Sequence, residues 1–278
     1  MTDVDAAPGQ PRGGQPQRTA HVVLLHGVGL DHTMWDGLRG LLEHETVALD
    51  LPGHGAQPPL RAPQSLAELA DDVLARLPEG AVHLVGFSLG ALIAQHIARF
   101  HPERVITLTC VSSVCQRTPE EAAAVEARLE TARADFAASA AASIDRWFPA
   151  GTSSPAARTV PAETIAATER VLLANDVPSY LHAYAVFAHG DRAIAPELGR
   201  ISAPTLAITG ELDPGSTPDM SRRLAAAVPG ARAHIVPGAR HMLPVEDAPA
   251  LAAALTDFIA QAPTDPAHPT HNVEVSHP

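Results

Sequence analysis

Residues 82–100 read VHLVGFSLGALIAQHIARF and join an apolar run to a helical pattern through a single serine. The run Val82–Phe87 predicts a strand, and Leu89–Phe100 predicts the helix that follows it. Gly86 and Gly90 flank Ser88 in the pattern G-x-S-x-G, and small residues are needed where a strand turns sharply into a helix. The stretch therefore predicts a strained turn that exposes the Ser88 hydroxyl at the edge of a sheet.

Apolar runs and helical patterns alternate on both sides of this turn, as they do in the βαβ units of a parallel sheet. Further strands are predicted at His21–Leu25, Thr46–Asp50, Thr107–Val111, Thr205–Gly210 and Ala233–Val236. Further helices are predicted at Ser65–Leu77, Thr217–Val228 and Ala248–Gln261, the first with a capping box formed by Ser65 and Glu68. The predicted fold class is α/β, with a mostly parallel, doubly wound sheet.

Residues 116–196 break the alternation, because they are alanine-rich, helical in pattern and without a strand signal. They follow the fourth recognisable strand and predict a helical cap inserted between two parts of a core. The core parts are residues 21–115 and 197–262. The aperiodic, Pro-rich ends at residues 1–20 and 263–278 predict a disordered leader and a disordered tail.

The composition excludes several kinds of chemistry. All 19 residues in the Lys+Arg count are arginine, so a Schiff-base lysine and a pyridoxal-phosphate anchor are excluded. The net charge of −12 argues against nucleic acid or an anionic membrane as a partner. Two cysteines, no secretory signal pattern and no apolar run of membrane-spanning length predict a cytoplasmic protein.

A serine nucleophile needs a base, and the base needs a carboxylate that orients it. His241 follows the last predicted strand in PGARHM, just ahead of the closing helix, and Asp213 follows the strand before it in GELD. Glu211 is the alternative carboxylate, but the spacing places Asp213 further out on its loop. The order Ser88, Asp213, His241 is that of the α/β-hydrolase triad.

An oxyanion that forms during acyl transfer needs fixed N–H donors. We expect one at the amide of Leu89, directly behind the serine, and the other at Val28 in the loop after the first strand. His26 begins that loop, and a histidine in this position more often bonds the backbone than takes part in catalysis. His54 in DLPGHG is expected to be structural for the same kind of reason.

The motifs LLHGVG, DLPGHG, GFSLGA, PTLAITGELD and PGARHM follow one another over residues 21–261. In this order and spacing the chain resembles the α/β-hydrolase superfamily. More narrowly it resembles 3-oxoadipate enol-lactonases of aromatic catabolism, in GVGLDHTMWD (27–36), RWFP (146–149) and GELDPGSTPDMSRRLAAAVPGA (210–231). Related esterases and C–C hydrolases share much of this pattern. The superfamily usually begins with two antiparallel strands, and the sequence before His21 shows no strand pattern, which leaves open a weak strand within residues 1–20.

The predicted cap offers candidates for substrate binding. Its aromatic side chains are candidates for the roof of a pocket, and these are Trp147, Phe148, Tyr180, Tyr184 and Phe187. Arg146 and Arg192 are candidates for a substrate carboxylate, because a guanidinium binds a carboxylate through two parallel hydrogen bonds. A small helical core and solvated surface arginines are the alternatives.

The leading hypothesis is a serine hydrolase that opens a small lactone or ester, in the first place an enol-lactone of the 3-oxoadipate type. A carboxylesterase, a C–C bond hydrolase or a perhydrolase on the same triad is the alternative, and a non-catalytic ligand receptor is a third. No cluster with metal-ligand spacing and no G-x-G-x-x-G after a strand is present, so neither a metal nor a cofactor is predicted. The substrate and the oligomeric state stay open.

Overall fold

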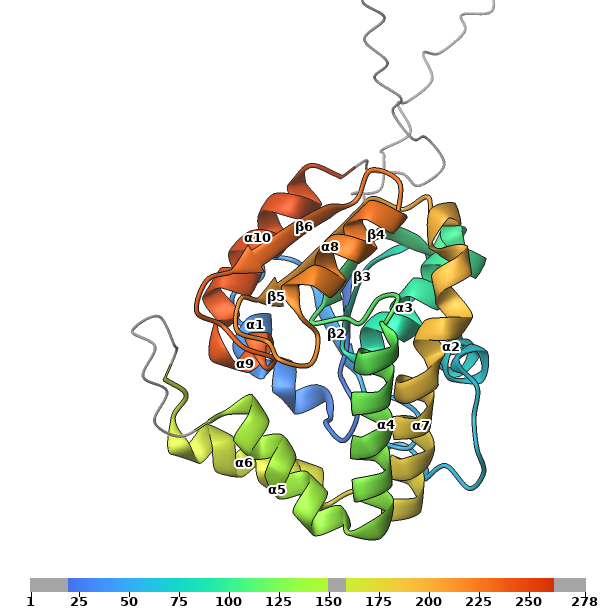
Figure 1. The fold of residues 1–278 in the computed structure, drawn as a ribbon. Coiled ribbons are helices and arrows are strands. Elements are labelled where there is room, and N and C mark those ends of the chain that lie inside the picture. Colours follow the sequence, from blue (N-terminus) through green and yellow to red (C-terminus); the bar gives the residue numbers. More distant parts are fainter. Residues whose placement is uncertain (1–19, 150–158, 263–278) are drawn as a thin grey trace, which may run out of the picture.

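A computed structural model describes residues 20–149 and 159–262. At its centre lies a six-stranded sheet in the order β2-β1-β3-β4-β5-β6 (Figure 1). The strands are β1 (Val22–Leu25), β2 (Thr46–Leu49), β3 (Val82–Phe87), β4 (Val105–Val111), β5 (Thr205–Gly210) and β6 (Arg232–Val236). Every neighbouring pair is parallel, which confirms the predicted α/β fold class.

The strand order reverses at β1, which pairs with β2 on one side and with β3 on the other. The chain therefore leaves β1 and β3 in opposite directions, and a crevice forms at the carboxyl ends of these two strands. Ligands bind at this point in open α/β sheets. The loop after β1 and the turn after β3 carry Val28 and Ser88, so the topology brings the two predicted elements together.

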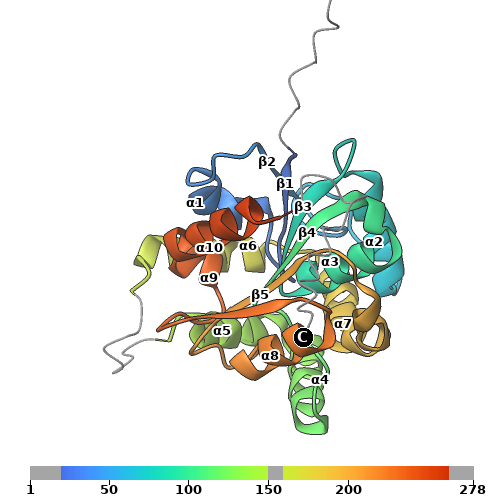
Figure 2. The same cartoon turned by 90° about the horizontal axis from the view of Figure 1, so that it is seen from above.

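Helices cover both faces of the sheet (Figure 2). Val23, Leu25 and Leu84 face one core with α2 (Leu66–Ala75), α3 (Leu89–Phe100) and α8 (Pro218–Ala227). The alternate residues Val22, Leu24 and Val85 face a second core with α1 (Asp36–Arg39) and α10 (Ala248–Ala260). The remaining short segments are η1 (His32–Trp35), η2 (Pro102–Arg104), η3 (Ala195–Arg200) and α9 (Leu243–Glu246). A period of two along buried strands thus produces the doubly wound arrangement.

Local sequence signals fix where several helices begin. The Ser65 hydroxyl accepts from the Glu68 amide, and a Glu68 oxygen accepts from the Ser65 amide at 2.7 Å, so the predicted capping box is present. Thr217 caps α8 by accepting from the Met220 amide. Element ends differ by one or two residues from the sequence prediction, as with β4, which already begins at Val105.

Between β4 and β5, where the sequence predicts a cap, the described residues form four α-helices ahead of η3. They are α4 (Pro119–Ala134), α5 (Phe136–Trp147), α6 (Ala162–Leu173) and α7 (Val177–Ile194). Helix α7 packs against α3 and α4, while α5 packs against α4 and α6. Figure 1 shows these helices beside the crevice end of the sheet. The predicted tail and all but one residue of the predicted leader lie outside the described residues, and so do residues 150–158. None of the described helices is both long and apolar enough to cross a bilayer.

Candidate active site

Ser88 stands on a strained turn between β3 and α3. Its φ of 53° and ψ of −111° lie in a region that L-residues rarely adopt. A Cβ atom at Gly86 would lie 2.2 Å from the Gly90 carbonyl oxygen, and one at Gly90 would lie 2.4 Å from the Leu25 carbonyl oxygen. Only glycine fits at either position. The turn therefore has the geometry that the G-x-S-x-G pattern predicts, with the serine held by crowded backbone.

The imidazole of His241 contacts a buried carboxylate. His241 Nδ1 lies 2.8 Å from Asp213 Oδ2, and the Asp213 side chain is fully buried. The other oxygen, Oδ1, accepts from the amides of Gly215 and Ser216 at 2.8 and 2.9 Å. These charge-assisted bonds fix the carboxylate. An Nδ1–H that donates to it leaves Nε2 as the proton acceptor of the ring.

Asp213 and His241 come together because their loops follow neighbouring parallel strands, β5 and β6. The Leu212 amide donates to the Ala239 carbonyl at 2.8 Å and so joins the two loops. The Ser112 hydroxyl, at the end of β4, donates to the His241 carbonyl at 3.0 Å. The position of the imidazole is thus set by three adjacent strand ends.

Two glutamates support the histidine loop without contacting the imidazole. Glu211 accepts from the Gly238 amide at 3.0 Å. Glu246 accepts from the amides of Arg240 and Met242 at 2.6 and 3.2 Å, although burial raises the pKa of this carboxyl. The structure therefore brings Asp213, and not the alternative Glu211, to His241.

Ser88, Asp213 and His241 line one cavity of about 50 Å³. A buried water needs about 10–15 Å³ of such space, so the cavity has room for only a few small groups. The Trp147 ring stacks on His241 with ring centroids 6.1 Å apart, and the Phe87 ring lies 5.0 Å from it. The other lining residues are Val28, Leu30, Arg128, Ser143, Arg146, Tyr180, Tyr184, Phe187, Pro214, Gly215 and Ser216.

Most predicted cap residues line this cavity, but two do not. Arg146, Trp147 and Tyr184 belong to the lining. Phe148 is half-buried against both cores and lies outside the lining, and Arg192 is exposed on α7. The structure therefore gives no support to a role of these two residues in the cavity.

Arg128 is a lining residue that the sequence reasoning missed. It lies on α4, three residues after buried Val125 and four before buried Ala132. This spacing places it at the margin of the buried face of the helix, since residues three and four apart are neighbours on a helix surface. The signal in the sequence was an arginine next to apolar residues that recur every three or four positions along a predicted helix.

The two predicted oxyanion donors sit beside the serine. Leu89 is the first residue of α3, where amides have no partner within the helix. Val28 lines the cavity from the loop after β1. Neither amide donates to an acceptor within residues 20–149 and 159–262. Both are thus available to an oxygen atom of a ligand.

The loop that carries Val28 is tied at its start by His26. The Nδ1 atom of this fully buried ring contacts the Gly27 carbonyl at 2.7 Å, and Nε2 accepts from the Leu51 amide at 2.8 Å. Burial, followed by the charge of His54, lowers the pKa of His26 to about 3. The ring is therefore neutral and serves the backbone, which confirms the structural role predicted for it.

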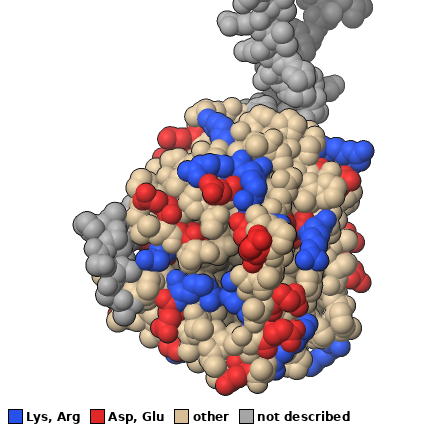
Figure 3. All heavy atoms as spheres, in the orientation of Figure 1, with Lys and Arg blue, Asp and Glu red and all other residues tan. Residues whose placement is uncertain are grey.

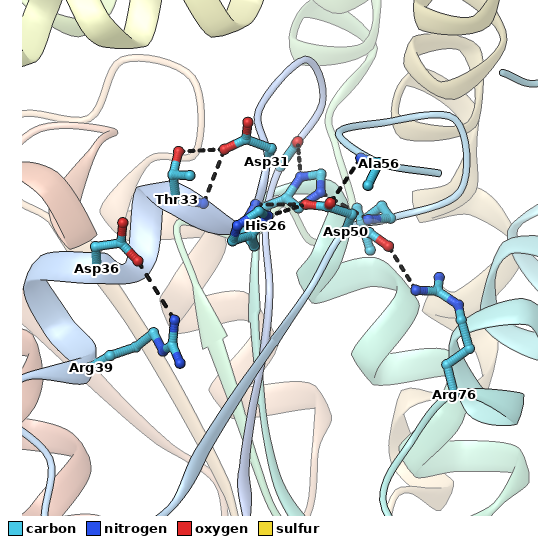
Figure 4. Close-up of polar contacts among 11 residues, drawn as sticks. His26, Asp31, Thr33, Asp36, Arg39, Asp50, Ala56 and Arg76 are labelled. Atoms are coloured by element: carbon cyan, nitrogen blue, oxygen red, sulfur yellow. Dashed lines mark hydrogen bonds and ion pairs between the residues drawn. The ribbon is translucent and has the colours of Figure 1, made fainter. Parts of the chain in front are cut away.

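Asp50 ties the same loop at its far end (Figure 4). Its carboxylate accepts from the amides of His32 and Ala56, each at 2.9 Å, and lies 2.8 Å from His32 Nδ1. The Arg76 guanidinium donates to the Asp50 carbonyl at 2.9 Å. The hydrogen bond that the ring donates to the Asp50 carboxylate raises the pKa of His32. The loop after β1 is therefore fixed at both ends to the segment after β2.

The two cysteines take no part in this site. Cys110 and Cys115 are buried and form no disulfide. Burial raises the pKa of both thiols, that of Cys115 to about 12, so neither is a ready nucleophile. Among the described side chains, no group of three or more His, Cys, Asp or Glu residues is arranged to hold a metal ion.

Comparison with known proteins places this geometry in a family. The sequence profile of the alpha/beta hydrolase family matches residues 22–255. The chain belongs to this family. The match covers all six strands and the four helices between β4 and β5, and it confirms the superfamily resemblance seen in the sequence motifs.

The chain is also similar to individual hydrolases. It is 31% identical over 243 residues to (E)-2-((N-methylformamido)methylene)succinate hydrolase of Acinetobacter baylyi, across 81% of this chain and 88% of that protein. The crystal structure of the enol-lactonase from Burkholderia xenovorans superposes with a TM-score of 0.77 at 26% identity, covering 90% of this chain and 94% of that one. A hydrolase from Pseudomonas aeruginosa gives a TM-score of 0.74 at 27% identity, covering 88% and 92%. Together with the family, these relatives support an ester-hydrolysing enzyme.

Proposed function

We propose that the chain is a serine hydrolase of small esters or lactones, with Ser88 as nucleophile, His241 as general base and Asp213 as the carboxylate that orients it. One observation carries the proposal. A serine on a strained, glycine-flanked turn shares a small cavity with an imidazole whose Nδ1 lies 2.8 Å from a fully buried carboxylate. This arrangement activates a hydroxyl that is otherwise a weak nucleophile.

In the first half of the reaction, Ser88 Oγ attacks the ester carbonyl carbon and passes its proton to His241 Nε2. The electron pair of the C=O bond moves to the oxygen, and the resulting oxyanion accepts hydrogen bonds from the amides of Leu89 and Val28. The intermediate then collapses, the bond to the leaving oxygen breaks, and that oxygen takes the proton from Nε2.

In the second half, a water molecule gives a proton to Nε2 and attacks the acyl-serine. Collapse of this intermediate releases the carboxylic acid and returns the proton to Ser88. With an enol-lactone, the leaving oxygen is an enolate that becomes a ketone, and both ends stay in one product molecule.

The substrate that we place first is an enol-lactone of the 3-oxoadipate type. The resemblance in residues 27–36, 146–149 and 210–231 and the similarity to the Burkholderia xenovorans enol-lactonase support this class. Two buried cysteines without a disulfide are in keeping with a reducing compartment, so we place the reaction in the cytoplasm.

A simple carboxylesterase is the second candidate, since one stretch of 99 residues is 46% identical to the pimeloyl-[acyl-carrier protein] methyl ester esterase of Citrobacter koseri, although it spans only 35% of this chain. A panel of an enol-lactone, p-nitrophenyl acetate and a vinylogous diketone separates the candidates. We expect the highest kcat/KM with the enol-lactone. A preference for the simple ester by orders of magnitude would overturn the lactonase part and leave the serine hydrolase intact.

The serine mechanism itself is tested by Ser88→Ala and by labelling with a fluorophosphonate. We expect the wild type to be labelled at Ser88, and the variant to lose labelling and about three or more orders of magnitude in kcat. Ser202→Ala, at an exposed loop position, is the matched control and is expected to keep both. Near-wild-type turnover in Ser88→Ala would show that this serine is not the nucleophile.

A further inference from the structure

Two arginines from different helices meet at the cavity that holds Ser88. Arg128 comes from α4 and Arg146 from the last turn of α5. Arg146 Nη2 donates to the Ser143 hydroxyl at 3.0 Å and Nη1 to the Ala142 carbonyl at 3.3 Å. A guanidinium has five N–H donors, so these two bonds position Arg146 and leave donors for a ligand.

Neither arginine has a protein carboxylate as partner. Within the described parts of the chain, no Asp or Glu forms an ion pair with Arg128 or Arg146. Other described arginines also form no ion pair, among them Arg104, Arg117 and Arg170, which donate to backbone carbonyls. Arg128 and Arg146 differ from these three in that they line the cavity. Basic and acidic side chains are interspersed over the face of the molecule seen in Figure 3. On the same helix α4, Arg133 pairs with Glu130, and Glu121 pairs with Arg223 at 2.7 Å.

The two positive charges work against each other inside the cavity. Burial, and after it the charge of Arg128, lowers the pKa of Arg146. Like charges in a partly desolvated site are unfavourable until an anion offsets them. The arrangement thus costs the empty protein free energy and favours the binding of a negatively charged group.

The other residues that line the cavity restrict the kind of molecule that can carry the negatively charged group. Tyr180 and Tyr184 stack with ring centroids 5.6 Å apart, and Trp147 stacks on His241. These rings form an aromatic wall beside the arginines. A compact molecule with one anionic end suits such a site, whereas a long neutral ester does not.

We propose that Arg128 and Arg146 together bind a carboxylate that the substrate carries in addition to the ester bond attacked by Ser88. The inference rests on the proposed serine hydrolase and narrows its substrates to short esters or lactones with a free carboxylate. Arg128 and Arg146 are binding residues and take no part in proton transfer.

The kinetic test compares two esters with the same leaving group and the same three methylenes, p-nitrophenyl hemiglutarate, which ends in a carboxylate, and p-nitrophenyl valerate, which ends in a methyl group. We expect the wild type to prefer the hemiglutarate. Arg128→Gln and Arg146→Gln are each expected to lose about ten- to hundredfold in kcat/KM on the hemiglutarate, mainly through KM, because a charge-assisted bond is removed. With the valerate, both variants are expected to stay within about twofold of the wild type. An equal loss on both esters would overturn the proposal.

Two further comparisons exclude a merely structural effect. Arg133→Gln changes an exposed arginine of the same helix, and Arg192→Gln changes an exposed arginine of α7; neither is expected to alter the preference. Arg128→Lys keeps the charge but not the planar fork, so we expect partial recovery on the hemiglutarate. Wild-type unfolding midpoints in Arg128→Gln and Arg146→Gln would show that the fold is retained. If Arg128→Lys behaves as Arg128→Gln on both esters, the proposal that Arg128 and Arg146 bind a substrate carboxylate (the carboxylate clamp) is wrong.

Binding without turnover separates this inference from the proposed reaction. Glutarate is titrated against Ser88→Ala while the tryptophan fluorescence is followed, with dimethyl glutarate as the neutral control. Of the two tryptophans, Trp147 lines the cavity beside Arg146 and Trp35 is buried in a core. We expect saturable binding of glutarate alone, lost in Ser88→Ala combined with Arg128→Gln. Fluorophosphonate labelling of the wild type without glutarate binding would reject the clamp and keep the hydrolase. Glutarate binding without fluorophosphonate labelling would keep the carboxylate site at Arg128 and Arg146 and reject the serine hydrolase.

Discussion

The two walls of the cavity are built differently. On the sheet side, Asp213 is fixed by two backbone amides and by His241, whose own carbonyl is held by Ser112 at the end of β4. On the cap side, Arg146 is held within the described residues by the Ser143 hydroxyl and by a carbonyl of its own helix. In the sheet wall, Asp213 and Ser88 are held by backbone that is closely packed. The cap wall presents side chains of helices, of which Trp147 also stacks on His241 of the sheet wall.

We expect the sheet wall to determine the rate of bond breaking and the cap wall to determine which substrate is preferred. The strand ends of β3, β5 and β6 carry the residues that we propose for catalysis, while side chains of α4, α5 and α7 line the rest of the cavity. Substitutions in the sheet wall are expected to lower kcat for every substrate. Substitutions in the cap wall are expected to change which substrate is preferred.

The largest effect beyond Ser88 itself is expected from Asp213→Asn. An amide neither stabilises the imidazolium nor selects the ring tautomer with the proton on Nδ1, so kcat should fall by about three to four orders of magnitude with KM nearly unchanged. The measurement is steady-state hydrolysis of p-nitrophenyl acetate. Glu211→Gln is the matched control on the same loop and is expected to keep most of the activity. A loss in Glu211→Gln as large as that in Asp213→Asn would place the orienting carboxylate elsewhere.

Gly90→Ala tests how closely the sheet wall is packed. The new Cβ atom would lie 2.4 Å from the Leu25 carbonyl oxygen and 2.5 Å from that of His26, and backbone cannot yield as a side chain does. We expect the free energy of unfolding in urea to drop by about 3 kcal/mol or more. At Gly40, φ is −70° and nothing lies within 4 Å of an added Cβ. Gly40→Ala should therefore be nearly neutral, and equal stability of the two variants would refute the close packing.

The same contrast explains which parts could be predicted from the sequence. The turn at Ser88 follows from local rules, because a strand that turns into a helix at a serine leaves room only for glycines beside it. Asp213 and His241 follow from their places after strands, and the choice of Asp213 over Glu211 from its position further along the loop. These are properties of short segments next to regular structure, and a single sequence contains them.

The cap was less predictable because its side chains are sorted by packing between helices. Arg128, Arg146 and Arg192 look alike in sequence, yet the first two line the cavity and the third is exposed. Which face of α4 or α7 turns toward the sheet depends on contacts far apart in the chain. Phe148 illustrates the same limit, since it lies one residue after Trp147 and packs on the cores instead of lining the cavity.

The smallest expected effect concerns the ion pair between His32 and Asp50, at the end of the loop after β1 that carries Val28. The hydrogen bond that the ring donates to the Asp50 carboxylate raises the pKa of His32 above its ordinary value of 6.5, and burial opposes this rise. A raised pKa in the folded state means that the pair stabilises the fold fully below pH 6.5 and loses this effect as the pH rises through the higher value. The His32 side chain is 45% exposed, so solvent screening limits the contribution to about 0.2–1 kcal/mol.

Urea unfolding of the wild type and His32→Gln at pH 6 and pH 9 measures this ion pair. We expect the wild type to be more stable by up to about 1 kcal/mol at pH 6 and the two proteins to converge at pH 9. His234→Gln changes an exposed histidine of β6 that has no ion pair in the described part of the chain, and it should show no such pH dependence. A difference between wild type and His32→Gln that grows from pH 6 to pH 9 would show that the neutral ring, and not the ion pair, holds the loop.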